Sequence, residues 1–263
     1  MQKFVTTTFK SGVGRITLNR PNKRNALTRD FIGQLNEAVE EFSNQDSARA
    51  VVIEAAGSVF CAGMDLGEMQ LRAASPDGKQ EWQKDSETYA ELLAGIYHLP
   101  MPTIAVLQGP VLAGGVGMVL ACDFVVASKD AFVMLPEPAR GITAGMVTPF
   151  LVQRIGVGPS SHLLLSGERM FAQRAAELGL IYAVVNPDEL HSRVDQLLGA
   201  IMTGSPAALQ ISKRHVQKCG MTNLDELLKM SVRVSAEARE TDDAREGLAA
   251  FLEKRKPNWQ QSS

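Results

Sequence analysis

The chain has 263 residues, in which 27 lysines and arginines stand against 29 aspartates and glutamates, for a formal net charge of −2. This near-balance argues against a nucleic-acid partner, because nucleic-acid binders usually carry a clear basic excess. Hydrophobic residues make up 45% of the chain and charged residues 21%, which is typical of a globular protein and excludes a disordered one.

The three cysteines, Cys61, Cys122 and Cys219, are odd in number and widely spaced, with no CxxC pair and no Cys/His cluster. This pattern argues against a disulfide framework and against a metal site, and it favours a reducing compartment. The first residues form neither an apolar signal core nor an Arg/Ser-rich leader. We therefore predict a cytoplasmic protein.

Hydrophobic periodicity predicts short strands and helices through the first hundred residues. We expect, in chain order, strands at residues 4–10 and 13–18, a helix that Thr28 caps and that runs to Phe42, and a strand at residues 50–53. Residues 68–95 have a helical pattern that the segment Ala-Ala-Ser-Pro-Asp-Gly at 73–78 interrupts. We predict that this interruption is a mobile flap.

The stretch from Leu99 to Cys122 contains no charged residue, which raises the question of a membrane span. Gln108-Gly109-Pro110 and Ala113-Gly114-Gly115 break the stretch into short pieces. A strand at residues 103–107 followed by a helix near 115–122 fits better than one spanning helix. We therefore predict two buried elements and no membrane partner.

Strands and helices also alternate in the rest of the chain, which becomes mostly helical after Gly156. We expect strands at residues 124–127, 132–134 and 181–185, and helices at residues 158–166, 172–178, 190–202, 206–219 and 224–250. The alternation is typical of an α/β core. We assign residues 1–200 to this core and residues 201–263 to a helical C-terminal region that packs on it or on a neighbouring subunit.

Two glycine-containing turns are candidates for binding an oxygen that becomes anionic. Gly114-Gly115 directly precedes an apolar, helix-compatible run, and a helix N-terminus leaves unpaired backbone N–H groups with a positive partial charge. The second turn, Cys61-Ala62-Gly63-Met64-Asp65, also lies between a strand region and a helix that Asp65 can cap. From spacing alone, the favoured interpretation of Gly114-Gly115 is that these glycines only pack a strand against a helix.

These turns, together with motifs along nearly the whole chain, are similar to the crotonase superfamily, the enoyl-CoA hydratase/isomerase family. The matching segments are Ile16–Pro21 with Arg24–Leu27, Phe60–Leu66, Gly109 with Ala113–Gly115, Ala121–Asp123, Leu135–Glu137 with Gly141-Ile142, and Glu246–Pro257. Each match alone is weakly specific. Their order and their coverage of the chain make the resemblance strong.

The resemblance implies an α/β spiral of repeated β-β-α turns with a helical C-terminal trimerisation region, assembled as a homotrimer or as a hexamer of paired trimers. It implies an acyl-CoA substrate, as in fatty acid metabolism, with coenzyme A as part of the substrate and no prosthetic group. The two oxyanion donors of the family map onto the backbone N–H groups of Met64 and Gly114. The adenine pocket of relatives maps onto Ala26, Ala62 and Asp65, and the CoA phosphates onto Arg24 and, from another subunit, Lys254 or Lys256.

One position departs from the family pattern. Typical hydratases of the family have one glutamate three residues after the oxyanion glycine and another in a Pro-Glu turn. Here the first position is Gly117, and only the second carboxylate, Glu137, is present. Burial after Val133-Met134-Leu135-Pro136 would raise its pKa above about 4.3, as acid–base work near neutral pH requires. Without the resemblance, a glutamate in a surface turn would be the simpler interpretation.

A single catalytic glutamate restricts the reaction. We expect an enoyl-CoA hydratase-type enzyme, in which Glu137 moves a proton while the thioester oxygen is held by the two amides. The alternatives are a Δ3,Δ2-enoyl-CoA isomerase, another crotonase chemistry such as decarboxylation or thioester hydrolysis, and an acyl-CoA binder without activity. The segment Met146–Phe150 followed by Arg154-Ile155-Gly156 resembles the branch with a small residue at position 117, which favours hydration.

Other candidate groups lack a supporting pattern. His98, His162, His191 and His215 are scattered without a shared motif. Ser58 and Cys61 have no neighbouring His/Asp signature for a nucleophile. We expect Asp123 to form structural hydrogen bonds instead of serving as a base.

Overall fold

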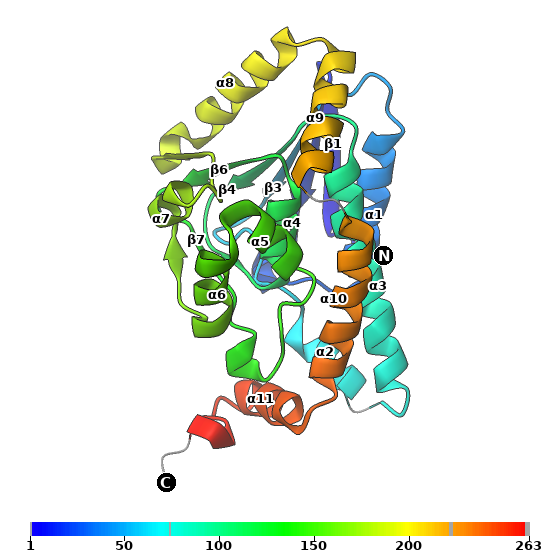
Figure 1. Ribbon diagram of the computed structural model, residues 1–263, viewed down its shortest axis with the longest axis vertical. Coiled ribbons are helices and arrows are strands. Elements are labelled where there is room, and N and C mark those ends of the chain that lie inside the picture. Colours follow the sequence, from blue (N-terminus) through cyan, green and yellow to red (C-terminus); the bar gives the residue numbers. More distant parts are fainter. Residues whose placement is uncertain (1, 74, 221–222, 261–263) are drawn as a thin grey trace.

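Two β-sheets form the centre of the computed structural model, which describes residues 2–73, 75–220 and 223–260 (Figure 1). The larger sheet has the order β1-β2-β3-β4-β6-β9 and the smaller one the order β5-β7-β8. The strands are β1 (Val5–Lys10), β2 (Val13–Leu18), β3 (Ala50–Ala55), β4 (Thr103–Leu107), β5 (Val111–Leu112), β6 (Phe124–Ser128), β7 (Phe132–Met134), β8 (Met170–Phe171) and β9 (Ala183–Val185).

Helices surround both sheets and extend the molecule at its C-terminal end. They are α1 (Arg29–Ser43), α2 (Leu66–Ala73), α3 (Gly78–His98), α4 (Gly114–Ala121), α5 (Thr148–Ile155), α6 (Val157–Ser166), α7 (Ala172–Glu177), α8 (Leu190–Thr203), α9 (Pro206–Gly220), α10 (Leu224–Arg239) and α11 (Asp242–Leu252). Short 3-10 turns join them, including η2 (Pro138–Arg140), which follows β7.

The large sheet is buried on both faces, which explains its nearly continuous apolar strands. From β2 to β9 its strands pair in parallel, and all five residues of β4 are buried. Alternate residues of β3 belong to two different cores: Val51 and Ile53 to the main one, Ala50 and Val52 to the one that α8 covers. A parallel sheet has apolar side chains on both faces, so both faces must be covered by other elements.

The chain repeats a strand in the large sheet, a strand or bridge in the small sheet, and a helix. After β3 comes a parallel bridge of Cys61 with Val111 and then α2, after β4 come β5 and α4, and β6 is followed by β7. Because β5 also pairs in parallel with β7, each turn of the chain lies beside the previous one. The segments that follow these small-sheet positions, 62–65, 113–115 and 135–141, therefore come to the same edge.

The predicted helix at residues 28–42 is confirmed, and Thr28 caps it by accepting a hydrogen bond from the Phe31 amide at 3.2 Å. The predicted interruption at 73–78 is also confirmed, since α2 ends at Ala73 and α3 begins at Gly78. Ala74 lies outside the described residues. The predicted mobility of the segment stays a prediction.

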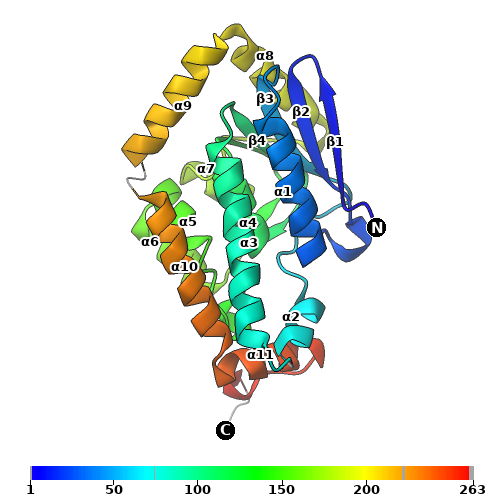
Figure 2. The same ribbon diagram turned by 90° about the vertical axis from the view of Figure 1, so that its right-hand side faces the viewer.

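One prediction about the later helices is wrong, and one helix was not predicted. The expected continuous helix at residues 224–250 is broken between α10 and α11, where Thr241 starts a new helix by accepting from the Ala244 amide at 3.1 Å. Helix α5 was not expected, although Pro149 in its first turn is a helix-start signal. Helix α10 packs against α3, and α11 packs against α2 and η2 of the same chain (Figure 2).

The charge-free stretch 99–122 forms β4, β5 and α4, the two buried elements that the glycines and prolines predict plus a short strand between them. Within residues 2–73, 75–220 and 223–260, no helix combines the length and the apolar character that crossing a bilayer requires.

Candidate active site

The two glycine-containing turns meet at the edge of the small sheet. The Leu112 amide donates to the Cys61 carbonyl at 2.9 Å, and the Leu27 amide donates to the Gly63 carbonyl at 2.8 Å. Gly63 has φ +86° and lies so close to the second turn that an added Cβ would be 2.4 Å from Ala113 Cβ and 3.3 Å from the Gly114 nitrogen. Only glycine permits this approach, because it has no side chain and tolerates positive φ.

The amides of Met64 and Gly114 are the two candidate oxyanion donors. Neither N–H takes part in a hydrogen bond within the described part of the chain. Gly114 is the first residue of α4, and Ala113 before it has φ 52°, so the turn leaves this amide at the positive end of the helix. Two unused donors on touching turns can hold an oxygen on which negative charge develops.

Glu137 lies in the next turn of the chain along the same edge. The residue is only 5% exposed, and its Oε2 atom has no hydrogen-bond partner among the described residues. Burial raises the pKa of Glu137 to about 7, against the opposing effects of its own backbone amide and of the Arg140 and Arg239 charges. A carboxyl group with this pKa exchanges protons readily near neutral pH.

The C-terminal helix fixes the turn that carries Glu137. A Cβ on Gly141 would lie 2.1 Å from the Asp243 carbonyl oxygen, and one on Gly247 would lie 2.4 Å from the Arg140 backbone. Glycines at these two positions therefore let α11 contact η2 backbone to backbone. Gly141 and Gly247 both lie in segments that are similar to the family, and this close packing explains why glycine is needed at each of them.

A single small cavity of about 40 Å³ joins these groups. Its lining contains the turns of Met64 and Gly114, the Glu137 carboxyl, and side chains from α3, α10 and the segment after η2. The other main contributors are Ala62, Tyr89, Arg140, Ile142, Met146, Ser235 and Arg239. Three residues predicted from sequence, Met64, Gly114 and Glu137, therefore share one cavity.

Comparison with known proteins decides the family. The enoyl-CoA hydratase/isomerase family model matches residues 8–262 of this chain. The chain belongs to this family.

Curated relatives and solved structures agree with this family over nearly the whole chain. A putative enoyl-CoA hydratase of Thermus thermophilus is 31% identical over 95% of this chain and 98% of its own. A probable mitochondrial enoyl-CoA hydratase 2 of Arabidopsis thaliana is 33% identical over 94% of this chain and 81% of its own. The crystal structure of an enoyl-CoA hydratase from Mycobacterium avium superposes with a TM-score of 0.88 at 32% identity, covering 99% of this chain and 100% of that one.

The predicted fold class is thereby confirmed as the α/β crotonase fold, with β-β-α units and C-terminal helices. The family acts on CoA thioesters.

Tyr89 occupies the space beside Gly117, where typical family hydratases have a second glutamate. A Cβ on Gly117 would lie 2.4 Å from the Tyr89 hydroxyl oxygen. This hydroxyl donates to the Gly114 carbonyl, and burial raises the pKa of Tyr89, with a smaller contribution from the Glu137 charge. The phenol is therefore neutral and fixed against the turn that carries one oxyanion amide.

Sequence reasoning missed Tyr89, Ser235 and Arg239 as cavity residues. Arg239 lies in the helix expected at residues 224–250, for which the sequence patterns indicated no role in the site. A signal was present in the spacing of Leu228, Val232, Ser235 and Arg239, which are four, three and four residues apart and thus share one helix face. All four are buried.

The residues predicted to bind CoA lie around the first turn and at the C-terminal end. Arg24 is exposed with φ 53°, and its carbonyl accepts from the Ala62 amide at 3.0 Å. The Ala26 carbonyl accepts from Arg20, whose guanidinium also pairs with Asp65 at 2.8 Å. Lys254 is exposed just beyond α11. The structure thus places Arg24, Ala26 and Ala62 together, and Lys254 in a different part of the chain.

Asp65 has a structural task. Its Oδ1 atom accepts from the amides of Gly67 at 3.1 Å and Glu68 at 3.4 Å, which confirms the predicted cap of α2. Although burial opposes it, hydrogen bonds from Arg20 and from these amides lower the pKa of Asp65. The carboxylate is therefore ionised and fully engaged.

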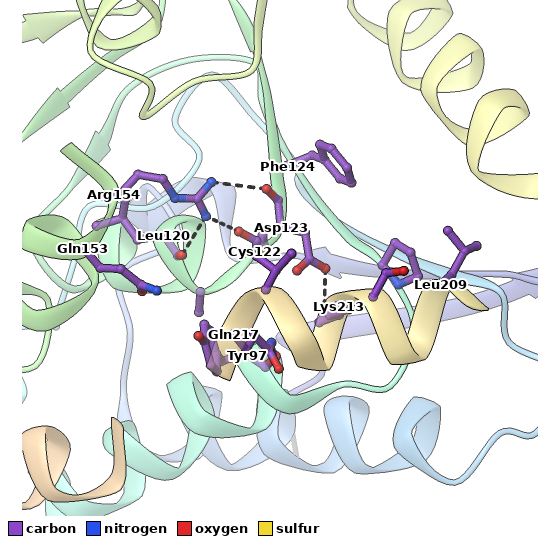
Figure 3. Close-up of a pocket in the computed structure, with 14 residues that line it drawn as sticks. Tyr97, Leu120, Cys122, Asp123, Phe124, Gln153, Arg154, Leu209, Lys213 and Gln217 are labelled. Carbon is purple, nitrogen blue, oxygen red and sulfur yellow. Dashed lines mark hydrogen bonds and ion pairs between the residues drawn. The ribbon is translucent and has the colours of Figure 1, made fainter. Parts of the chain in front are cut away.

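A larger hollow of about 490 Å³ lies at the other end of α4, beside α9 (Figure 3). Arg154 donates to the carbonyls of Leu120, Cys122 and Asp123, and Lys213 donates to the Asp123 carboxylate at 2.7 Å and to the Met101 carbonyl at 3.0 Å. The charged groups of this hollow are thus used in holding helices together. Asp123 also accepts from Thr103, which confirms its predicted structural role.

None of the four histidines, all of them within the described residues, lines the cavity that contains Glu137. Cys61 is buried, and burial raises its pKa to about 12, so the thiol is not ionised at neutral pH. Neither residue type offers a competing base or nucleophile at this site.

Proposed function

We propose that this chain is an enoyl-CoA hydratase that uses a single catalytic glutamate. Glu137 takes a proton from water as the water oxygen bonds to C3 of the 2-enoyl thioester. The electron pair of the C2–C3 double bond moves to the thioester carbonyl, and the amides of Met64 and Gly114 stabilise the resulting enolate oxygen. Glu137 then returns the proton to C2, so that one water molecule is added in total.

The observation that carries this proposal is that the Oε2 atom of Glu137 shares a cavity with the Met64 and Gly114 amides, and that all three groups lack a hydrogen-bond partner among the described residues. Each oxyanion donor is worth roughly 3 kcal/mol of transition-state stabilisation in other enzymes. The pKa of about 7 lets the carboxyl group serve first as base and then as acid.

A second candidate reaction is Δ3,Δ2-enoyl-CoA isomerisation. Among the described residues, Glu137 is the one carboxyl group that lines the cavity. One carboxyl suffices to take a proton from C2 of a 3-enoyl thioester and return it at C4, and no water needs to be positioned. The same oxyanion donors would stabilise the intermediate dienolate.

The experiment compares wild type, Glu137→Gln and Glu168→Gln with crotonyl-CoA and with but-3-enoyl-CoA. We expect wild type to hydrate crotonyl-CoA and Glu137→Gln to lose about a thousandfold in kcat while still binding the thioester. Glu168 is exposed, so its variant serves as the matched control. Near-normal turnover by Glu137→Gln would refute the role of this residue.

The products distinguish the remaining alternatives. Migration of the double bond without hydration would replace the hydratase by the isomerase. Free CoA would indicate thioester hydrolysis, and carbon dioxide from a malonyl-type thioester would indicate decarboxylation. Binding without any turnover would leave a non-catalytic acyl-CoA binder.

We also propose that Ala26, Ala62 and Asp65 contribute to the adenine pocket, and that Arg24 and a neighbouring subunit's lysine at position 254 meet the CoA phosphates. This assignment presumes a homotrimer or a hexamer of paired trimers. Sedimentation should therefore give three or six times the mass of one chain. A monomer at micromolar concentration would remove the neighbouring lysine from the proposal.

A further inference from the structure

Tyr89 brings a buried hydroxyl group into the cavity of Glu137, and the addition of water described above gives this group no task. Tyr89 lies on α3, which packs against α4, and the residue is 1% exposed. Its side chain lines the same cavity as Glu137 and the turns of Met64 and Gly114. A hydroxyl group at this place can both donate and accept hydrogen bonds.

The hydrogen of this hydroxyl group is already engaged. Tyr89 Oη donates to the Gly114 carbonyl oxygen. Burial raises the pKa of Tyr89 well above its usual value, and the Glu137 charge acts in the same direction, so the phenol keeps its proton at neutral pH. A hydroxyl group has one hydrogen and two lone pairs. Toward the cavity, the Tyr89 oxygen therefore acts as an acceptor.

The Tyr89 oxygen also fills the space that a side chain at position 117 would need. A Cβ on Gly117 would lie 2.4 Å from Tyr89 Oη, and its next contacts would be the two methyl groups of Leu93 at 3.2 and 3.3 Å. No side chain of α4 can therefore supply a polar group at this point. Position 117 contributes no acceptor, and the oxygen of Tyr89 contributes one directly beside it.

The cavity has room for a water molecule between two acceptors. Its volume of about 40 Å³ exceeds what one water needs, and an enclosed water requires at least two polar partners. When Glu137 is ionised, its Oε2 atom is an acceptor without a partner among the described residues, and Tyr89 Oη has lone pairs left. A water that donates one hydrogen to each keeps its own lone pairs free to attack carbon.

The other polar groups that line the cavity suit this task less well. The guanidinium groups of Arg140 and Arg239 are donors and cannot accept a hydrogen from water. The hydroxyl group of Ser235 comes from α10, and its Cβ would lie 3.2 Å from a Cβ on Gly145, in the segment after η2. Tyr89 Oη instead lies beside the oxyanion turn, 3.5 Å from the place of a Cβ on Gly114.

We propose that Tyr89 Oη is the second hydrogen-bond acceptor of the water that adds to C3, so that Tyr89 orients the attacking oxygen. The inference rests on the proposed function, because hydration needs an oriented water. One hydrogen of the water passes to Glu137 as the oxygen bonds to C3. The hydrogen that faces Tyr89 stays on this oxygen and becomes the hydroxyl hydrogen of the product, so Tyr89 neither gains nor loses a proton.

Two reactions of the same site separate the orientation of water from proton transfer. Hydration of crotonyl-CoA needs the water, whereas exchange of the C2 hydrogens of saturated butyryl-CoA with D2O needs only Glu137 and the oxyanion amides. For Tyr89→Phe we expect the kcat of hydration to fall about a hundredfold. The exchange rate, counted by mass spectrometry, and the affinity for butyryl-CoA, measured by calorimetry, should stay within about threefold of wild type.

Other results for Tyr89→Phe would overturn the inference. Equal losses of hydration and of exchange would show that Tyr89 acts on the oxyanion turn through the Gly114 carbonyl. Unchanged hydration would show that the reaction does not need the phenolic oxygen. A larger loss of hydration in Ser235→Ala than in Tyr89→Phe would assign the water to Ser235.

Tyr97→Phe is the matched control, because it removes the hydroxyl group of another buried tyrosine on the same helix. Tyr97 is 9% exposed and does not line the cavity of Glu137. Hydration and exchange by this variant should both match wild type. A loss of hydration as large as that of Tyr89→Phe would show a general effect on α3 and would overturn the inference.

A hydroxyl group moved to α4 tests where the acceptor has to lie. Without the phenolic oxygen, a Cβ at position 117 would meet nothing closer than 3.2 Å, so Gly117→Ser fits once Tyr89→Phe is present. We expect this double variant to hydrate crotonyl-CoA about tenfold faster than Tyr89→Phe, the worth of one hydrogen bond. Tyr89→Phe with Gly117→Ala adds the same Cβ without a hydroxyl group. Equal hydration by the two double variants would overturn the placement of the acceptor.

Wild type separates the failure of this inference from the failure of the proposed function. If wild type and Tyr89→Phe hydrate crotonyl-CoA equally well, the hydratase stands and the role of Tyr89 is overturned. If wild type exchanges the C2 hydrogens of butyryl-CoA but hydrates no enoyl thioester, the hydratase itself is overturned, and the role of Tyr89 with it.

Discussion

At the scale of single residues, Glu137 combines the features that a proton-transfer group needs, and its burial has a cost. The folded state raises its pKa to about 7 from the ordinary 4.5. A carboxyl group with a raised pKa binds its proton more tightly in the folded chain than in the unfolded one. The protonated Glu137 therefore makes its full contribution to the free energy of unfolding below pH 4.5. This contribution is lost as the pH rises through about 7.

This cost predicts that Glu137→Gln stabilises the protein at high pH. At pH 8 the variant should gain up to about 3 kcal/mol in free energy of unfolding relative to wild type, because the amide cannot ionise. The difference between variant and wild type should shrink as the pH falls toward 5. Urea titrations at several pH values measure it, and a difference that does not change with pH would contradict a buried, high-pKa carboxyl group.

At the scale of elements, the contact between two turns sets the distance between the oxyanion donors. Gly63→Ala adds a methyl group 2.4 Å from Ala113 Cβ at a residue with φ +86°, so the turns must separate. We expect hydratase activity to fall by about a hundredfold, because displacements near 1 Å have this effect on oriented sites. The same substitution at Gly33, whose Cβ would meet nothing within 4 Å, should leave activity unchanged.

Gly63 is a better position than Gly114 at which to test the oxyanion site by substitution. In the structure a Cβ on Gly114 lies 3.5 Å from Met64 Cε and from Tyr89, which is ordinary contact. Alanine therefore fits at Gly114 and does not fit at Gly63. Equal losses for both variants would contradict this geometry.

Helix α9 is attached to the core by a part-buried ion pair of Lys213 with Asp123 and by Gln217, which donates to the Tyr97 carbonyl at 2.5 Å. Lys213 Nζ reaches the Asp123 carboxylate and the Met101 carbonyl, and its side chain is only 6% exposed. Lys213→Met should lower the free energy of unfolding by about 3 kcal/mol, because Asp123 then keeps its charge without its cation. Lys218→Met, exposed on the same helix, should change stability by less than about 0.5 kcal/mol. Thermal or urea unfolding compares the two variants.

At the scale of the whole molecule, sequence patterns predict the strands and helices better than the contacts between segments that are distant in the chain. The buried strands around residues 50–53 and 103–107 are predictable because parallel strands covered on both faces are almost uninterrupted apolar runs. The contact of the turns at Gly63 and Ala113 is not predictable from periodicity, since it arises from β5 pairing with distant segments. Only the family resemblance predicts that these two turns lie close together.

The same limit applies to the C-terminal helices. Their helical periodicity is visible in sequence, yet the break at Thr241 and the inward face of Ser235 and Arg239 depend on what α10 packs against. From its sequence alone, a helix rich in charged residues is predicted to be exposed to solvent, because the sequence does not show which helix it packs against. The candidate site thus divides into backbone turns that motifs identify and buried side chains that only the packed structure reveals.

The central claim is that two amides from separate turns hold one thioester oxygen while a single carboxyl group faces the adjacent carbons. The most direct measurement is a crystal structure of the Glu137→Gln variant with bound crotonyl-CoA. We predict that the thioester oxygen lies about 2.9 Å from both the Met64 and the Gly114 nitrogens, with the residue-137 side chain beside C2 and C3. A thioester oxygen that contacts neither amide, or a side chain at position 137 turned away from the acyl carbons, would contradict the account.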